Sequence, residues 1–168
     1  MRPRAFTLVE SVLVIVLTLL LTAAAIGGLR GTQTWRASAA VSRVQSDLLY
    51  ARSAALLSGR RTLCVFNTSQ GTYELQQEAS PASGAIAGVV LEHPVTGAAW
   101  RVTLGDLATG LALSFAPALN PTEIGFDATG MPISRAGSPL ANDIAMRLGS
   151  AGTVTLRAGS GLCEVSWP

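Results

Sequence analysis

The sequence has no lysine, one histidine and two cysteines, and this scarcity excludes several kinds of catalytic and metal site. His93 is followed by Pro94, and no second imidazole exists to complete a Ser-His-Asp triad or a zinc site. The GxSxG, HExxH, GxGxxG and P-loop motifs are all missing, and the 17 glycines are scattered along the chain. We therefore predict that the chain is not an enzyme, has no catalytic or metal site and binds no cofactor.

Basic residues are few, and all of them are arginine, so the charge balance depends on a handful of positions. The formal net charge is +2, and two of the twelve arginines, Arg2 and Arg4, lie within the first five residues. Without residues 1–5, ten arginines face ten acidic residues, which leaves no net charge. A chain without a net positive field gives no general reason to expect nucleic acid as a partner.

An apolar run from Phe6 to Leu29 dominates the N-terminal region. At about 1.5 Å per residue, a helix of this length crosses a hydrocarbon core of about 30 Å. Arg2 and Arg4 precede the run, and the positive-inside rule then places the N-terminus in the cytoplasm and everything after Leu29 outside. We predict a single-pass membrane helix followed by an extracytoplasmic domain.

Glu10 lies inside this apolar run, where a carboxylate costs about 2.5 to 3.5 kcal/mol on insertion scales. Such a residue needs a cationic partner. A cut between Ala5 and Phe6 would create an α-amino group four residues before Glu10. In a helical array, that amine could pair with Glu10 of its own or of a neighbouring subunit and fix the axial register of the two.

A conventional secretory signal is the alternative interpretation of the N-terminus. Arg2, Arg4, the apolar stretch and the Ala23-Ala24-Ala25 run would then form a signal that is cut before Ile26. The product would be a soluble secreted β-domain. Glu10 and the length of the apolar stretch count against this alternative, and N-terminal sequencing separates the two.

Beyond the apolar run, the sequence predicts a helical continuation and then a β-rich domain. Apolar residues recur at spacings of four and three over residues 30–58, at Ala37, Val41, Val44, Leu48, Ala51 and Ala55. Arg43 and Asp47 are four residues apart off this seam, and we expect them to pair on a solvated face. Gly27, Gly28 and Gly31 are expected to weaken the helix, and Gly59 to end it.

Short segments rich in Val, Leu, Thr, Phe or Tyr, separated by Gly, Pro, Asn or Asp, fill residues 59–168. We predict an α+β fold in which a long N-terminal hydrophobic helix packs against a C-terminal antiparallel β-sheet domain. Loops are expected at Glu78–Gly88 and Ser134–Asn142. The predicted strands are Arg61–Asn67, Thr72–Gln76, Val89–Glu92, Trp100–Leu104, Leu111–Phe115, Glu123–Asp127, Asp143–Leu148, Thr153–Arg157 and Leu162–Ser166.

The two cysteines, Cys64 and Cys163, have neither the CxxC spacing nor the histidine companions of a zinc or redox site. A disulfide between them is one interpretation, and it requires export because cytosolic thiols are kept reduced. Two separate buried thiols are the other. Composition leaves both open.

The basic leader followed by Ala5-Phe6-Thr7-Leu8-Val9-Glu10 resembles the class III signal of bacterial type IV prepilins. The resemblance implies cleavage after Ala5 by prepilin peptidase, N-methylation of Phe6 by the same enzyme, and an assembly role for Glu10. Ala5 stands where the family usually has glycine. Residues 1–5 would be the leader, 6–29 the transmembrane and filament-core helix, 30–58 its amphipathic continuation and 59–168 the globular pilin domain.

Further segments resemble the GspH/FimT branch of minor pilins and pseudopilins, namely Tyr50–Ala55, Thr62–Val65, Phe126–Gly130 and the hairpin at Gly159–Gly161. The resemblance implies a low-copy subunit near a filament tip that works with other pilins and an inner-membrane assembly platform. We expect the domain in the periplasm and then in a type IV pilus serving adhesion, motility or DNA uptake. The pseudopilus of type II secretion is the alternative. The basic C-terminal run linked to DNA binding in this branch is replaced here by Leu162-Cys163-Glu164, so DNA binding is not carried over.

Overall fold

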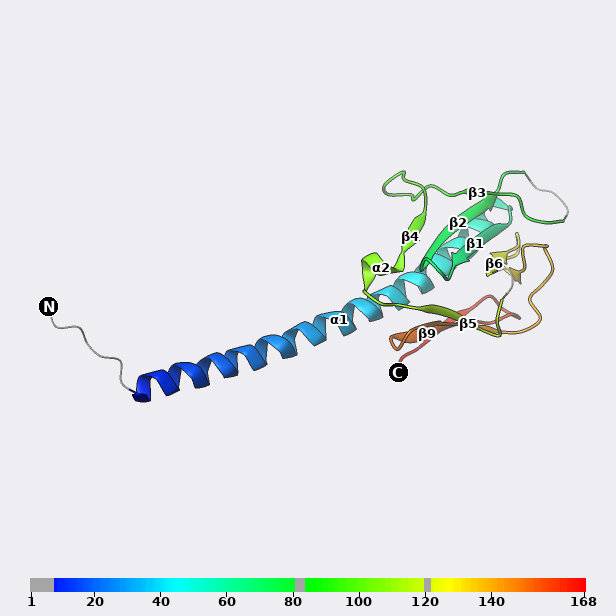
Figure 1. Cartoon of the computed structure of the whole chain (residues 1–168). Coiled ribbons are helices and arrows are strands. Elements are labelled where there is room, and N and C mark those ends of the chain that lie inside the picture. Colours follow the sequence, from blue (N-terminus) through cyan, green and yellow to red (C-terminus); the bar gives the residue numbers. More distant parts are fainter. Residues whose placement is uncertain (1–7, 81–83, 120–121) are drawn as a thin grey trace. The chain divides into compact units, whose positions relative to one another are not determined.

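The computed structural model describes residues 8–80, 84–119 and 122–168, with the side chains of residues 23–32 outside that description (Figure 1). The chain divides into two units, one that ends at Trp35 and one that runs from Arg36 to Pro168. The first consists of helix alone over its described residues. The second contains the rest of that helix, all the strands of the described chain and a short second helix.

The long helix α1 runs without a break from Leu8 to Ser58. The expected weakening at Gly27, Gly28 and Gly31 therefore does not interrupt it, because a glycine costs a helix interior only about 1 kcal/mol relative to alanine. Gly59 ends the helix as predicted. Its φ of +66° is the left-handed conformation of a helix C-terminus, and its N–H donates to the Ala55 carbonyl at 2.9 Å.

Six strands form the first antiparallel sheet, in the order β3-β2-β1-β6-β7, with β4 also paired to β2. The hairpin of β1 and β2 gives the sheet its centre, and β6 pairs with the other side of β1. The strands are β1 (Thr62–Asn67), β2 (Thr72–Glu78), β3 (Gly88–Val90), β4 (Arg101–Thr103), β6 (Glu123–Phe126) and β7 (Pro132–Ile133).

Four strands form the second antiparallel sheet, in the order β10-β9-β8-β5. They are β5 (Leu113–Ala116), β8 (Ile144–Leu148), β9 (Gly152–Leu156) and β10 (Cys163–Ser166). The short helix α2 (Leu104–Leu107) lies between β4 and β5 in the chain. Every strand predicted from the sequence overlaps one of these, whereas β7 and α2 were not predicted.

One face of α1 packs in the same hydrophobic core as residues of both sheets. Val41, Val44, Leu48, Ala51 and Ala55 of the predicted seam are buried, and Ala40 joins them. They share one hydrophobic cluster with inward-facing residues of both sheets, including Leu75, Phe126, Met146 and Leu156. The α+β fold with a helix packed on antiparallel sheets is therefore as predicted.

Candidate assembly surface

The first turns of α1 carry large apolar side chains on every side of the helix. Each of them is between 49% and 82% exposed. A helix that is apolar all round is stable only when something apolar surrounds it. The residues are Leu8, Val9, Val12, Leu13, Val14, Ile15, Val16, Leu17, Leu19, Leu20 and Leu21.

The hydroxyl groups of the two threonines in this segment donate to carbonyl groups of the helix itself. Thr18 Oγ1 donates to the Val14 carbonyl at 2.7 Å, and Thr22 Oγ1 donates to the Thr18 carbonyl at 2.6 Å. Because these donors are satisfied within the helix, the threonines add little polarity to its surface. Glu10, in the first turn, supplies the one acidic side chain between Leu8 and Thr22.

Ala5 and Phe6, the predicted processing site, lie outside the described residues. Within residues 8–80, 84–119 and 122–168, no helix has the combination of length and hydropathy that crossing a membrane requires. Those same ranges hold no group of three or more His, Cys, Asp or Glu side chains arranged to hold a metal ion.

Cys64 lies on β1 and Cys163 begins β10, and both thiols are free in the structure. Burial is the main cause that raises the pKa of each, to about 11 for Cys163 and well beyond its ordinary range for Cys64. Neither thiol is therefore a reactive nucleophile in the folded domain. The His93 side chain packs within the domain. Its Nδ1 accepts a hydrogen bond from the Val95 N–H at 3.3 Å, and the centre of its ring lies 4.5 Å from that of Trp100.

Asp47 is a buried carboxylate that anchors α1 to the first sheet. Its side chain was expected on a solvated face, but the residue is 3% exposed. Tyr73 donates its hydroxyl to Oδ2 at 2.6 Å and Trp100 donates Nε1 to the same oxygen at 3.2 Å. Arg43 Nε lies 3.0 and 3.1 Å from the two carboxylate oxygens. The only sequence signal was the position of Asp47 between the core residues Val44 and Leu48.

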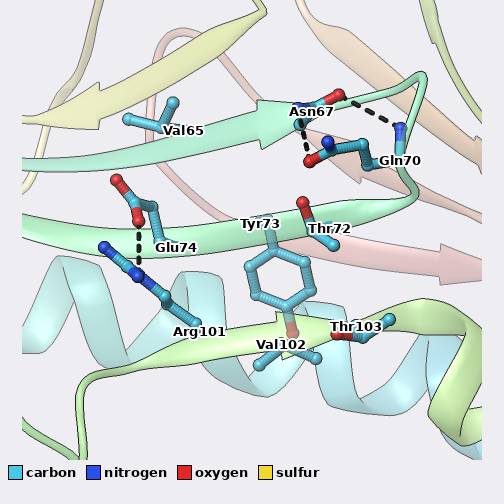
Figure 2. Close-up of a pocket in the computed structure, with 9 residues that line it drawn as sticks. All are labelled: Val65, Asn67, Gln70, Thr72, Tyr73, Glu74, Arg101, Val102 and Thr103. Carbon is cyan, nitrogen blue, oxygen red and sulfur yellow. Dashed lines mark hydrogen bonds and ion pairs between the residues drawn. The ribbon is translucent and has the colours of Figure 1, made fainter.

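A groove of about 410 Å³ opens on the face of the first sheet opposite to the buried side chains Cys64 and Leu75 (Figure 2). Arg101 Nε donates to Glu74 Oε2 at 2.9 Å across it, and Asn67 Nδ2 donates to Gln70 Oε1 at 3.0 Å at its end. These polar side chains satisfy one another, and the lining contains no nucleophile with an adjacent base. The lining residues are Val65, Asn67, Gln70, Thr72, Tyr73, Glu74, Arg101, Val102 and Thr103.

The fold is similar to that of a solved minor pseudopilin. Two structures of EpsH, a minor pseudopilin of the type 2 secretion system of Vibrio cholerae, match with a TM-score of 0.56. Identity is 12% and 13%, over 79% of this chain and 96% and 94% of theirs. The type IV minor pilin FimU of Pseudomonas aeruginosa matches with a TM-score of 0.48 at 16% identity, over 76% of this chain and 90% of that one. No protein-family model and no curated protein matches the sequence. The similarity to EpsH shows that the described domain has a pilin-like fold.

Proposed function

We propose that this chain is a minor pilin or pseudopilin, a structural subunit that assembles through α1 into a filament with other pilins. One observation carries the proposal: a helix that is apolar on every side, apart from one acid in its first turn, is joined to a domain of pilin-like fold. Fully burying a large apolar side chain stabilises by about 1.5 to 3 kcal/mol. Packing Leu8–Leu21 among the helices of neighbouring subunits therefore keeps these side chains out of water once the helix has left the membrane, and so stabilises the assembled filament against dissociation into water.

Processing comes first in this proposal. Residues 1–5 form the leader, and prepilin peptidase cleaves between Ala5 and Phe6 and N-methylates Phe6. Before assembly, the segment from Phe6 to Leu29 holds the subunit in the bacterial inner membrane with its domain in the periplasm. An inner-membrane assembly platform then moves the helix into the filament core.

Glu10 sets the register of the subunit in the filament. Its carboxylate pairs with the new amine of Phe6, in its own or in an adjacent subunit. An ion pair in a poorly solvated helix bundle is strongly direction- and distance-dependent, because an unpaired charge left there is costly. Only one axial position of the helix satisfies both groups.

Replacing Glu10 by alanine tests the assembly role. We expect Glu10→Ala to be processed and to remain in the membrane fraction, while its recovery in sheared filaments falls to background. Thr18→Ala is the matched control, since it also removes a polar group from the same helix but no charge, and it should assemble normally. Filaments that contain Glu10→Ala at the wild-type level would contradict the role of Glu10.

The mature N-terminus separates this proposal from the secretory alternative. Mass spectrometry of the native protein is expected to find N-methylated Phe6 as the first residue. A product that begins at Ile26 would instead be a soluble secreted β-domain without the assembly helix, and the filament proposal would be wrong.

Two kinds of filament remain to be separated by phenotype. Deletion of the gene is expected to abolish twitching motility, adhesion or transformation if the filament is a type IV pilus. If it is the pseudopilus of type II secretion, the deletion instead abolishes release of secreted enzymes. Complementation with the wild-type chain, and its failure with Glu10→Ala, links the phenotype to assembly.

A further inference from the structure

We propose that Cys64 and Cys163 form a disulfide bond that joins the two sheets of the domain. The bond goes beyond the filament role, and its formation in the cell rests on export of the domain, which belongs to that role. The first argument is position: Cys64 is on β1 of one sheet, paired with Leu75 and Ile124, and Cys163 is on β10 of the other, paired with Leu156. Both side chains pack in the same hydrophobic cluster beneath α1.

Both cysteines lie against the same two turns of α1. Gln45 Nε2 donates to the carbonyl of Cys163 at 3.0 Å, which places the start of β10 beside this part of the helix. Cys64 lies between two contacts to the same helix: Thr62 Oγ1 donates to the Ala51 carbonyl at 2.9 Å, and Tyr73, the strand partner of Phe66, donates its hydroxyl to Asp47 at 2.6 Å.

The turn before β10 also comes close to the first sheet. A methyl group added to Gly161, two residues before Cys163, would lie 2.6 Å from the Gly130 carbonyl oxygen and 3.4 Å from Pro132 Cδ. Gly130 and Pro132 belong to the turn and strand that follow β6, the neighbour of β1. The turn before β10 therefore packs directly on the side of the first sheet that carries Cys64's partner strand.

Such a bond would add a covalent link where the described chain has no backbone pairing. Within residues 8–80, 84–119 and 122–168, the two sheets share no paired strands. Linking residues 64 and 163 closes a long loop, and in the chain-entropy model long loops gain the most from a cross-link because the unfolded ensemble loses the most freedom. The linked domain should accordingly resist unfolding better than the reduced one.

The bond must form while the chain folds. Disulfide exchange requires a thiolate, and burial keeps both thiols protonated in the folded domain. With glutathione disulfide as oxidant, one cysteine thiolate attacks it to form a mixed disulfide and release one glutathione. The second cysteine then displaces the other glutathione, so that the protein loses two protons and two electrons and two reduced glutathione molecules form.

Oxidative refolding of the full chain in a mild detergent tests the geometry. The protein is unfolded and reduced, refolded with reduced and oxidised glutathione, then denatured and treated with N-ethylmaleimide without reductant. We expect no alkylation before reduction, alkylation of both cysteines after it, and a linked peptide pair in a proteolytic digest. The linked form should also unfold at a higher denaturant concentration than the reduced form. In the Cys163→Ser control, Cys64 should be alkylated without reduction.

Alkylation of both cysteines without reductant, in protein that has refolded to native circular dichroism, would overturn the bond. A second arm applies the same alkylation to protein taken directly from cells. Linked cysteines there support both the bond and export. Linked cysteines after refolding but free thiols in cells support the bond while contradicting export, so failure of the site and failure of the proposed function give different results.

Discussion

At the scale of single residues, Asp47 shows how a local sequence pattern can place a side chain wrongly. Arg43 lies four residues earlier, and that spacing predicts an exposed helix pair worth a few tenths of a kcal/mol. Asp47 is buried instead, and its hydrogen-bond donors in the core are Tyr73 and Trp100, which are 26 and 53 residues away in the chain. No local pattern can report partners at such separations, so the predicted pair was right and its environment was wrong.

Asp47→Ala is expected to destabilise the domain by about 3 kcal/mol, because it leaves the buried donors of Tyr73 and Trp100 without an acceptor. Chemical denaturation of the full chain in a mild detergent measures the change. Glu164→Ala is the control: it breaks a pair with Arg157 in which the two side chains are 57% and 47% exposed, and exposed pairs contribute about 0 to 1 kcal/mol. Equal losses for the two variants would show that burial of Asp47 is energetically unimportant.

At the scale of elements, regular periodicity in the sequence predicted the long helix, whereas the shortest elements were missed. The spacing of Val41, Val44 and Leu48 predicted both the helix and its buried face, and Gly59 its end. Helix α2 was missed because Leu104 continues the apolar pattern of β4, and four residues are too few to show helical periodicity. Strand β7 was missed because it begins with Pro132, a residue that sheets accept at an edge, where β7 lies.

Two glycines with similar backbone angles give a matched test of how the turn before β10 packs. Gly59 and Gly161 both have a φ of +66°, but an added Cβ meets nothing within 4 Å at Gly59 and lies 2.6 Å from the Gly130 carbonyl oxygen at Gly161. Gly59→Ala is expected to cost about 1 to 2 kcal/mol from the left-handed backbone alone. Gly161→Ala should cost about 1 to 3 kcal/mol more, because the turn must move away.

Denaturation midpoints of the two variants provide the comparison. If Gly161→Ala is no less stable than Gly59→Ala, the turn at Gly161 does not pack closely on the turn at Gly130. One argument for the cross-link between Cys64 and Cys163 is then lost.

At the scale of the whole molecule, the assignment of strands to two sheets could not be predicted from the sequence. Pairs that are adjacent in the chain, such as β1 with β2 or β8 with β9, follow from the turns between them. The pairing of β1 with β6, and the placement of β5 in the other sheet, depend on packing across α1. The apolar surface of Leu8–Leu21, in contrast, could be predicted from the sequence. An apolar run that contains one acidic residue is a pattern of consecutive residues and does not depend on the fold.

The buried Tyr73 hydroxyl and Cys64 thiol make the stability of the whole domain sensitive to alkaline pH. The pKa of Tyr73 is raised by burial and then by the charge and hydrogen bond of Asp47, and that of Cys64 is raised chiefly by burial. In the unfolded chain these groups lose their protons near their ordinary pKa values of about 10 and 8.5. Above those values the folded state binds more protons than the unfolded state, so the free energy of unfolding falls as pH rises.

We therefore expect the reduced protein to retain its stability below about pH 8.5 and then to lose up to about 1.4 kcal/mol per pH unit for each group above its ordinary pKa. In the protein with Cys64 and Cys163 linked, the decline should begin only near pH 10, where Tyr73 titrates in the unfolded chain. The absence of lysine makes this window clear, since two cysteines and two tyrosines are the side chains that ordinarily titrate in it. Tyr73→Phe should be less stable at pH 7, where it loses a hydrogen bond to Asp47, yet show a shallower decline above pH 10. Denaturation curves of both proteins between pH 7 and 11 should therefore converge, and parallel declines would show that the buried phenol does not hold its proton.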